Sequence, residues 1–236
     1  MAAVDLLTTT ALTHDFSGLR AVDHVDFDLR QGEVHALIGP NGAGKSTFVN
    51  LLCGRIPVQT GRIVFDGHDI TRLPAHARVA RGIAYTFQIT SIYANLPVFD
   101  NVALAVQQTG TGSRRADTLA ALARVGLDSR AAQTAGTLAY GHQRLLEIAM
   151  GLALRPGLLI LDEPTQGLAH SEIDAFNTLV RALTPQTTVL LIEHNMDVVM
   201  DLADRITVLN RGAKLTTGTP GKIRADPAVQ AAYLGG

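Results

Sequence analysis

Apolar and polar positions alternate along the chain in a way that predicts buried strands joined by helices. Residues 34–38, 158–161 and 188–192 are mostly apolar runs, which is typical of strands covered on both faces of a parallel sheet. Apolar residues at helical spacing follow the first two runs, beginning at Phe48 and at Ile173. This alternation predicts an α/β fold with a mainly parallel sheet.

Shorter strand signals lie nearer the two ends of the chain. Between residues 4 and 38, apolar pairs and alternating positions surround the turn Ser17-Gly18, and residues 61–65 form another short strand. These signals predict an antiparallel β part at the N-terminus. Residues 206–216 predict a hairpin, and residues 227–234 predict a terminal helix.

The pattern becomes helical after Gln88 and stays so until about Pro156. Alanine-rich and amphipathic stretches replace the strand signals there, and no low-complexity linker flanks them. We therefore expect a single domain over residues 1–236, with a helical lobe inserted in the α/β core. The expected parts are the core, residues 1–87 and 157–236, and the lobe, residues 88–156.

A glycine-rich turn stands between the first buried strand and the first helix. It fits the spacing G-x-x-x-x-G-K-[ST] with Gly39, Pro40, Asn41, Gly42, Ala43, Gly44, Lys45, Ser46 and Thr47. The backbone N–H groups of such a turn can wrap a polyphosphate, and the start of the helix adds partial positive charge. Lys45 can reach the outer phosphates, and the Ser46 hydroxyl can bind Mg²⁺. We therefore expect a nucleoside triphosphate site here.

Polar residues also follow other strands of the expected sheet. Asp162 and Glu163 come after one buried strand, His194 after the next, and Gln88 after a third. The carboxyl ends of parallel strands meet at one sheet edge, so these side chains should lie near the glycine-rich turn. Asp162 and Gln88 are expected to reach the metal ion or its water. Glu163 is expected to deprotonate an attacking water, and His194 to donate to the γ-phosphate.

Composition narrows the possible partners. Of 236 residues, 47% are apolar and 17% charged, and the formal net charge of −1 gives no broad electrostatic basis for binding nucleic acid. Cys53 is the only cysteine, which suits a reducing compartment. The first residues lack a signal-peptide pattern, and no apolar run approaches the ~18–20 residues of a membrane span. The chain is expected in the cytoplasm, and any membrane role would need a partner.

In this order, the motifs resemble those of the nucleotide-binding subunits of ABC transporters, along essentially the whole chain. The glycine-rich turn matches Walker A, residues 158–163 match Walker B with its catalytic glutamate, Gln88 matches the Q-loop and His194 the switch histidine. Phe16 stands at the position of the aromatic residue that stacks on the nucleotide base. The family signature, usually L-S-G-G-Q, is matched by Leu138, Ala139, Tyr140, Gly141, His142 and Gln143. The resemblance implies an ATPase that uses ATP and Mg²⁺, with Glu163, His194, Lys45 and Gln88 acting in catalysis.

The resemblance also implies protein partners. In the family, two ATPase subunits sandwich two nucleotides head to tail, so the signature of one chain serves the nucleotide of its identical or paralogous partner. The apolar segment after Gln88, which includes Tyr93 and Phe99, would receive a helix of a transmembrane permease subunit. Alternatively, these side chains are simply the core of the helical lobe. Binding to a permease would hold the protein at the inner face of the cell membrane.

Several residues depart from the family pattern. Ala139 replaces the usual serine of the signature, so one hydroxyl donor to the partner's γ-phosphate is missing, and Tyr140 replaces a glycine. After Walker B, Ala169 and His170 stand in a segment where many relatives carry an aspartate. Glu163 is present, so we still expect a site that hydrolyses ATP.

The branch of the family is indicated by three features. These are the tyrosine in the signature, residues 192–196 and the ending from Gly218 to Gly235, which look like those of the ATPases of branched-chain amino-acid and urea-type importers. The implied function is ATP hydrolysis that drives import through separate membrane subunits. The alternatives are the ATPase of another importer or of a lipopolysaccharide-type exporter, and a soluble ABC ATPase without transport. A small-molecule kinase, the remaining alternative, would need neither the signature nor the switch histidine.

Overall fold

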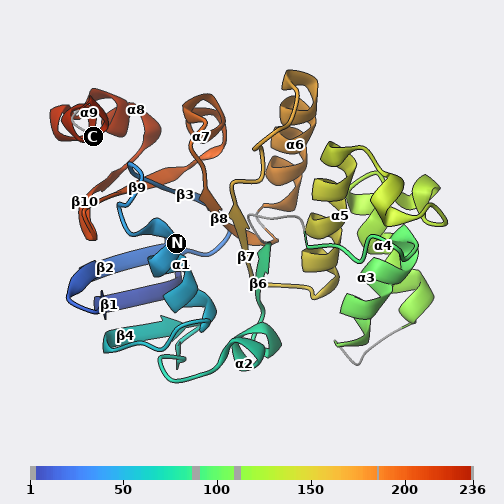
Figure 1. The fold of residues 1–236 in the computed structure, drawn as a ribbon, viewed down its shortest axis with the longest axis horizontal. Helices are drawn as coiled ribbons and strands as arrows, with labels where there is room; N and C mark the ends of the chain where they lie inside the picture. The colour runs from blue at the N-terminus through green and yellow to red at the C-terminus, as the bar shows by residue number, and fades with distance from the viewer. Residues whose placement is uncertain (1–3, 87–90, 109–112, 185, 235–236) are drawn as a thin grey trace.

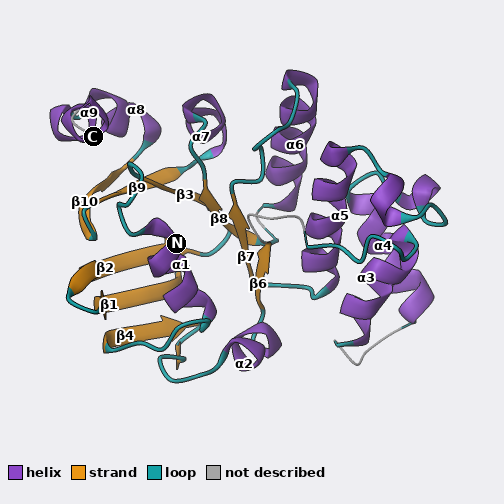
Figure 2. Ribbon diagram, in the orientation of Figure 1, coloured by secondary structure: helices purple, strands orange, loops and turns teal. Residues whose placement is uncertain are grey.

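A six-stranded sheet forms the centre of the molecule (Figures 1 and 2). The computed structural model describes residues 4–86, 91–108, 113–184 and 186–234. The strand order is β10-β9-β3-β8-β7-β6, in which β10 runs antiparallel to β9 and all other neighbours are parallel. The strands are β3 (Val34–Ile38), β6 (Ile83–Thr86), β7 (Leu158–Asp162), β8 (Thr188–Ile192), β9 (Arg205–Asn210) and β10 (Ala213–Gly218).

A smaller, four-stranded antiparallel sheet contains the first strands of the chain, in the order β2-β1-β4-β5. The first strand of the chain joins two runs, around Leu6 and Leu12, that are separate in the sequence pattern. Ala11 between them has φ 46°, and the register with the neighbouring strand shifts there, as at a β-bulge. The strands are β1 (Asp5–Phe16), β2 (Leu19–Arg30), β4 (Thr60–Phe65) and β5 (His68–Asp69).

Helix α1 (Lys45–Cys53) lies between the two sheets. Its side chains Phe48, Leu51 and Leu52 are fully buried, and they share one apolar cluster with residues of β1 and β2 on one side and of β7 and β8 on the other. The helix ends at Gly54, which adopts the left-handed conformation with φ 71°. Burial on both sides fixes α1, and therefore the turn that precedes it, relative to the strand ends.

Helices α5 (Tyr140–Ala153) and α6 (His170–Leu183) belong to a second apolar cluster with the other face of the sheet. Leu159, Leu161 and Leu191 of the sheet lie in this cluster with Phe176 and Leu146 of the helices. The remaining helices of residues 91–157 pack on α5 in the same cluster (Figure 1). They are α3 (Val98–Gln107), α4 (Arg114–Arg124) and 3-10 turns at Asp128–Arg130 and Ala135–Thr137.

Three short helices were not expected from the sequence, and one of them is α8 (Pro220–Ala225). Helix α2 (Ala75–Ala80) precedes β6, and α7 (Met196–Leu202) follows β8. A third apolar cluster joins α7 to the edge of the sheet near β9, together with residues of α8 (Pro220–Ala225) and α9 (Pro227–Leu234). The predicted hairpin and the predicted terminal helix are confirmed by β9, β10 and α9.

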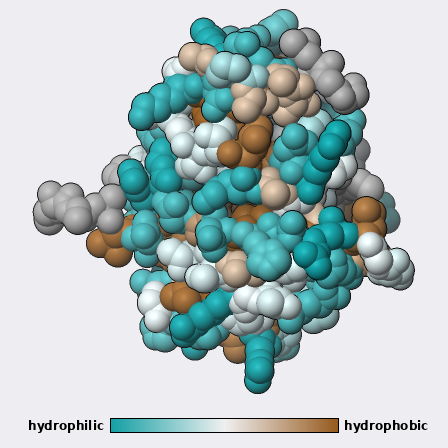
Figure 3. Space-filling model, turned by 90° about the vertical axis from the view of Figure 1, so that its left-hand side faces the viewer, coloured by the Kyte–Doolittle hydropathy of each residue, from teal (hydrophilic) through white to brown (hydrophobic). Residues whose placement is uncertain are grey.

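The predicted fold class is confirmed by the mainly parallel sheet, the antiparallel N-terminal sheet and the helices between β6 and β7. The division into a core and a lobe with the boundaries given above stays a prediction. Figure 3 shows mostly hydrophilic side chains, with separate apolar ones, at the end of the molecule that carries α9 and the outer strands. Among the described residues, no helix has the length and apolarity needed to cross a membrane.

Candidate functional site

The glycine-rich turn occupies residues 39–44, between the end of β3 and the start of α1. At Gly44, φ is +95° and a Cβ would stand 2.2 Å from the backbone oxygen of Ala21. At Gly39, a Cβ would stand 2.2 Å from the backbone oxygen of Leu209. The neighbouring backbone thus leaves no room for side chains at these positions, so the turn keeps its open shape only with glycine there.

Lys45 is the first residue of α1 and its side chain folds back into the turn. Nζ donates to the backbone oxygens of Gly39, at 2.7 Å, and Pro40, at 3.1 Å, and only 7% of the residue is exposed. Burial lowers the pKa of Lys45, whereas the carboxylates of Glu163 and Asp162 raise it. The ammonium group is therefore held inside the turn, near the carboxylates of Asp162 and Glu163.

A cavity of about 710 Å³ opens over the turn. It is lined by residues 41–47 together with Phe16, Glu163 and His194, so side chains from distant parts of the sequence meet at one place. Arg20 and Arg211 also line it, and neither was singled out from the sequence. The cavity volume is in the range of ligand pockets, and the cations Lys45, Arg20 and Arg211 line it. Both features suit a polyanionic nucleotide.

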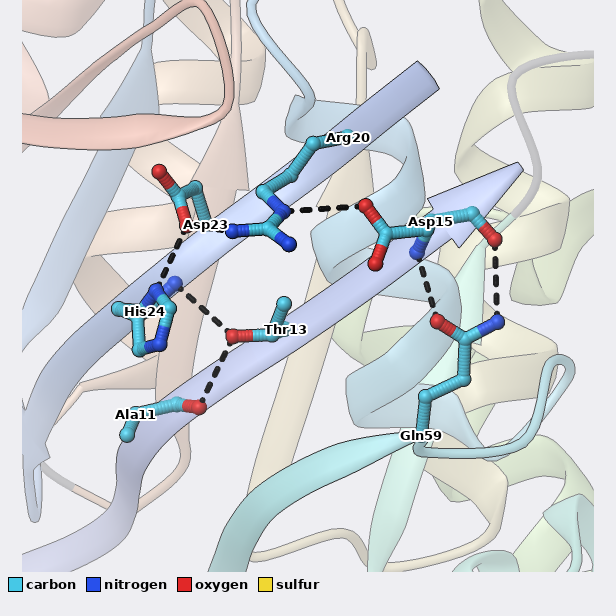
Figure 4. Close-up of polar contacts among 7 residues, drawn as sticks. All are labelled: Ala11, Thr13, Asp15, Arg20, Asp23, His24 and Gln59. Atoms are coloured by element: carbon cyan, nitrogen blue, oxygen red, sulfur yellow. Dashed lines mark hydrogen bonds and ion pairs between the residues drawn. The ribbon is translucent and has the colours of Figure 1, made fainter. Parts of the chain in front are cut away.

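Phe16 ends β1, is 47% exposed, and presents its ring at the rim of this cavity. The hairpin that carries it is tied on both sides (Figure 4). Arg20 donates from Nε to Asp15 Oδ1 at 3.0 Å, and the Asp15 backbone N–H donates to Gln59 Oε1 at 2.7 Å. These contacts hold the hairpin, and with it the exposed Phe16 ring, at the rim of the cavity.

Asp162 and Glu163 leave the end of β7 in different directions. Asp162 is 6% exposed, and its Oδ2 accepts a hydrogen bond from the Tyr85 hydroxyl at 2.7 Å. Burial raises the pKa of Asp162, although the Tyr85 hydrogen bond acts in the opposite direction. Glu163 has φ 50°, and its backbone N–H donates to Ile192 at 2.8 Å. This left-handed step, strained for a residue with a Cβ, turns Glu163 out of the strand line into the cavity.

Glu163 and His194 are in direct contact. Nε2 of His194 lies 2.7 Å from Oε1 of Glu163, and both residues line the cavity. Glu193, which the sequence did not single out, fixes the backbone beside them. It is 3% exposed and accepts hydrogen bonds from Thr165 and from the His194 backbone N–H, the latter at 2.9 Å. The sequence did contain a signal for Glu193, because this carboxylate stands directly between a buried strand and the candidate catalytic residue His194.

Comparison with known proteins places this arrangement in a family. A family model described as ABC transporter matches residues 22–166. The chain belongs to the ABC transporter family. As a member it is an ATP-binding cassette and an ATPase. A second model, described as branched-chain amino acid ATP-binding cassette transporter, matches residues 213–236.

Individual relatives of this ABC ATPase cover nearly its whole length. A high-affinity branched-chain amino acid transport ATP-binding protein of Pseudomonas aeruginosa is 39% identical, over 98% of both chains. Its counterpart in Escherichia coli is also 39% identical over 98% of both chains. Among solved structures, the ADP conformation of an ATP-binding cassette of an ABC transporter has a TM-score of 0.87, 27% identity and coverage of 99% of this chain and 100% of the other. The cassette cbiO1 of Clostridium perfringens has a TM-score of 0.86 at 26% identity, covering 95% and 92%.

The signature segment of this ABC ATPase lies away from the cavity that its own turn forms. Helix α5 begins at Tyr140, after Ala139, which provides no side-chain cap. Gly141 faces Glu172, whose Oε1 would stand 2.2 Å from a Cβ at that position, and Gly167 packs on the Tyr140 ring. In the described part of the chain, the cavity lining contains none of residues 138–143. Tyr140 therefore connects the start of α5 to the segment that follows Walker B.

Gln88 lies outside the described residues, as does the beginning of the segment after it. Further along, Val98 is fully buried in the helical cluster, whereas Tyr93 is 56% exposed. Tyr93, Leu104 and Met150 line a groove of about 200 Å³ that Tyr85 also reaches. In the described part of the segment after Gln88, Val98 therefore belongs to the core of the helical lobe, whereas Tyr93 lies on the surface.

Proposed function

We propose that this ABC ATPase binds ATP with Mg²⁺ and hydrolyses it to drive the import of branched-chain amino acids through separate membrane subunits. The observation that carries the catalytic part is the meeting of Lys45, Glu163 and His194 at one cavity above a turn that only glycine permits. The transport part is supported by the relatives and by the model matched at residues 213–236.

Each group in the cavity has a role in this proposal. The N–H groups of the turn and the Lys45 ammonium bind the phosphates, and the exposed Phe16 ring stacks on the adenine base. Glu163 takes a proton from the attacking water, and His194, whose Nε2 contacts Glu163 in this structure, donates an N–H to the γ-phosphate in place of that contact. Gln88 would complete this set from its position after β6.

The donor set near the turn fits a magnesium ion. The Ser46 hydroxyl lines the cavity, and the buried Asp162 carboxylate lies close enough to Lys45 to affect its pKa. Hydroxyl and carboxylate oxygens are hard ligands, and Mg²⁺ at such sites is usually held by one or two carboxylates plus substrate phosphates. When bound, the ion neutralises charge on the β- and γ-phosphates.

The signature residues, Leu138, Ala139, Tyr140, Gly141, His142 and Gln143, are proposed to serve the nucleotide of a second ATPase subunit. Helix α5 starts without a side-chain cap from Ala139, and no residue of this segment lines the cavity in the described part of the same chain. The dimer partner is a second copy or a paralogous ATPase. Hydrolysis then needs two chains, although each chain folds its own turn and carboxylates.

The permease subunits are proposed to dock at the groove lined by Tyr93, Leu104 and Met150. Exposed aromatic and apolar side chains around a groove suit an apolar helix of a partner. This contact would place the ATPase on the inner face of the cell membrane, while the membrane subunits select the solute.

Transport in vesicles tests the proposal. The chain would be purified with the membrane subunits that co-purify with it and reconstituted into vesicles. ATP is supplied outside the vesicles. Radiolabelled leucine, isoleucine or valine is placed inside them in one experiment and outside in another. Import moves solute toward the side that holds ATP, so we expect ATP-dependent loss of the label from inside the vesicles, together with phosphate release that requires no acceptor. Phosphate release without movement of these amino acids would leave an ATPase with another cargo and would contradict the transport part.

A further inference from the structure

We propose that Tyr85 is a positioning residue that holds the Asp162 carboxylate in the orientation in which it binds Mg²⁺. This inference rests on the proposed function, because it takes Asp162 to be a metal ligand. Tyr85 belongs to none of the motifs recognised in the sequence, and its role follows from its place in the sheet and from a single contact.

The sheet register brings the two side chains together. Tyr85 on β6 is paired with Ile160 on β7, and Asp162 lies two residues further along β7. Residues two apart on a strand point to the same face, so Tyr85 and Asp162 share the face that packs on α1. The tyrosine side chain is long enough to reach this diagonal neighbour, and its hydroxyl donates to Asp162 Oδ2 at 2.7 Å.

The ring of Tyr85 is itself held in place. The Arg55 guanidinium lies over it, 4.9 Å from the ring centroid, and the ring packs against the apolar cluster around α1. Cys53 and Val79 line a cavity of about 200 Å³ beside it. A donor on a ring packed in this way fixes the direction of the hydrogen bond more firmly than a flexible side chain would.

The chemistry of the contact suits a metal ligand. A hydroxyl donor occupies one carboxylate oxygen without adding positive charge, so the negative charge of Asp162 stays available to a cation. A lysine or arginine at position 85 would compete with the ion instead. Loss of the donor on Oδ2 would free the carboxylate to rotate. Removal of a group that orients a ligand typically lowers metal affinity by about 10–100-fold.

The test is metal binding by the Tyr85→Phe variant. Mn²⁺ is titrated in the presence of a non-hydrolysable ATP analogue, and bound metal is measured by electron paramagnetic resonance. The half-saturating Mn²⁺ concentration should rise about tenfold, whereas affinity for the analogue without metal should stay unchanged. Turnover of the variant should recover toward the wild-type value as Mg²⁺ is raised. An unchanged half-saturation would overturn the proposal, even if the variant melts at a lower temperature.

Two further variants separate the possible failures. Asp162→Asn should weaken metal binding more than Tyr85→Phe. If it does and Tyr85→Phe does not, only the positioning role is wrong; if Asp162→Asn leaves metal binding intact, the proposed metal site itself is wrong. Thr217→Val is the matched control, since it removes a hydroxyl that pairs with Thr207 at 2.8 Å near the other edge of the same sheet. Its metal half-saturation should equal that of the wild type.

Discussion

Nε2 of His194 and Oε1 of Glu163 lie 2.7 Å apart, although the residues are 31 positions apart in the sequence. They stand at the ends of adjacent parallel strands, β8 and β7, and the backbone N–H of Glu163 donates to Ile192 at 2.8 Å. The strand pairing therefore sets the contact between the two side chains. A γ-phosphate above Lys45 would meet both of them at once.

Glu163→Gln should leave ATP binding intact and lower turnover by about 10²–10⁴-fold, because the amide cannot accept a proton from water. Phosphate release and equilibrium binding of a fluorescent ATP analogue measure the two quantities separately. Asp174→Asn, which changes an exposed carboxylate on α6 instead, is the control and should keep most of the activity. Near-normal turnover of Glu163→Gln would remove Glu163 from the role of general base.

Lys45→Ala should weaken ATP binding and abolish phosphate release, since it removes the cation that the turn encloses. Lys214→Ala removes an exposed lysine from β10 and should bind ATP as the wild type does. Isothermal titration calorimetry compares the two variants directly. Equal ATP affinity of both would be incompatible with a phosphate site at the turn.

Gly44→Ala and Gly18→Ala form a matched pair, because both glycines have nearly the same φ, +95° and +93°. A Cβ at Gly44 would stand 2.2 Å from Ala21, whereas a Cβ at Gly18 would meet nothing within 4 Å. We expect about 1–2 kcal/mol of destabilisation from the left-handed conformation in each case. Gly44→Ala should lose more, together with ATP binding. Denaturant unfolding gives the comparison, and equal losses would contradict the clash.

Glu33 should make stability depend on pH. Burial acts to raise the pKa of Glu33, but hydrogen bonds from His35 and the Arg30 backbone, with the charge of Arg205, lower it overall below its usual value. A carboxylate with a depressed pKa stabilises the folded state above its unfolded pKa, and this contribution is lost as pH falls through the folded value.

Glu33→Gln should therefore lower the free energy of unfolding near neutral pH by about 1.5–3 kcal/mol, the range for hydrogen bonds to charged groups. The difference from the wild type should shrink as the pH falls below the usual value of 4.5. Urea unfolding at several pH values measures it. Asp174→Asn, an exposed change on α6, should show no such trend. A difference that stays constant at all pH values would exclude ionised Glu33 as its source.

The meeting of Lys45, Glu163 and His194 at one cavity was predictable from the strand pattern. Lys45 must follow a glycine turn to reach phosphates, and Asp162, Glu163 and His194 follow apolar runs that could only be buried strands. Tyr85 and Glu193 were not predictable in the same way, because their contacts, with Asp162 and with Thr165, depend on which strands and loops become neighbours.

The missed helices have a similar explanation. Helix α2 is short and contains Arg78, which sequence reasoning would place on the surface. Arg78 is 2% exposed, and its guanidinium donates to the backbone oxygens of Leu51 and Leu52, at the end of α1. Because the buried position in α2 is taken by a charged side chain, which satisfies the last carbonyls of α1, the sequence of α2 shows no apolar helical pattern. Helix α7 did carry a signal, since Asn195 caps its start and Val198, Val199 and Leu202 lie on one buried face.

The most direct test of the account is a crystal structure of the Glu163→Gln variant with Mg²⁺ and ATP. We expect the γ-phosphate between Lys45 and His194, the metal between Ser46 and Asp162, and the signature of a second chain on the far side of the nucleotide. Nucleotide bound away from the turn, with the Asp162 and residue 163 side chains remote from its phosphates, would contradict the central claim.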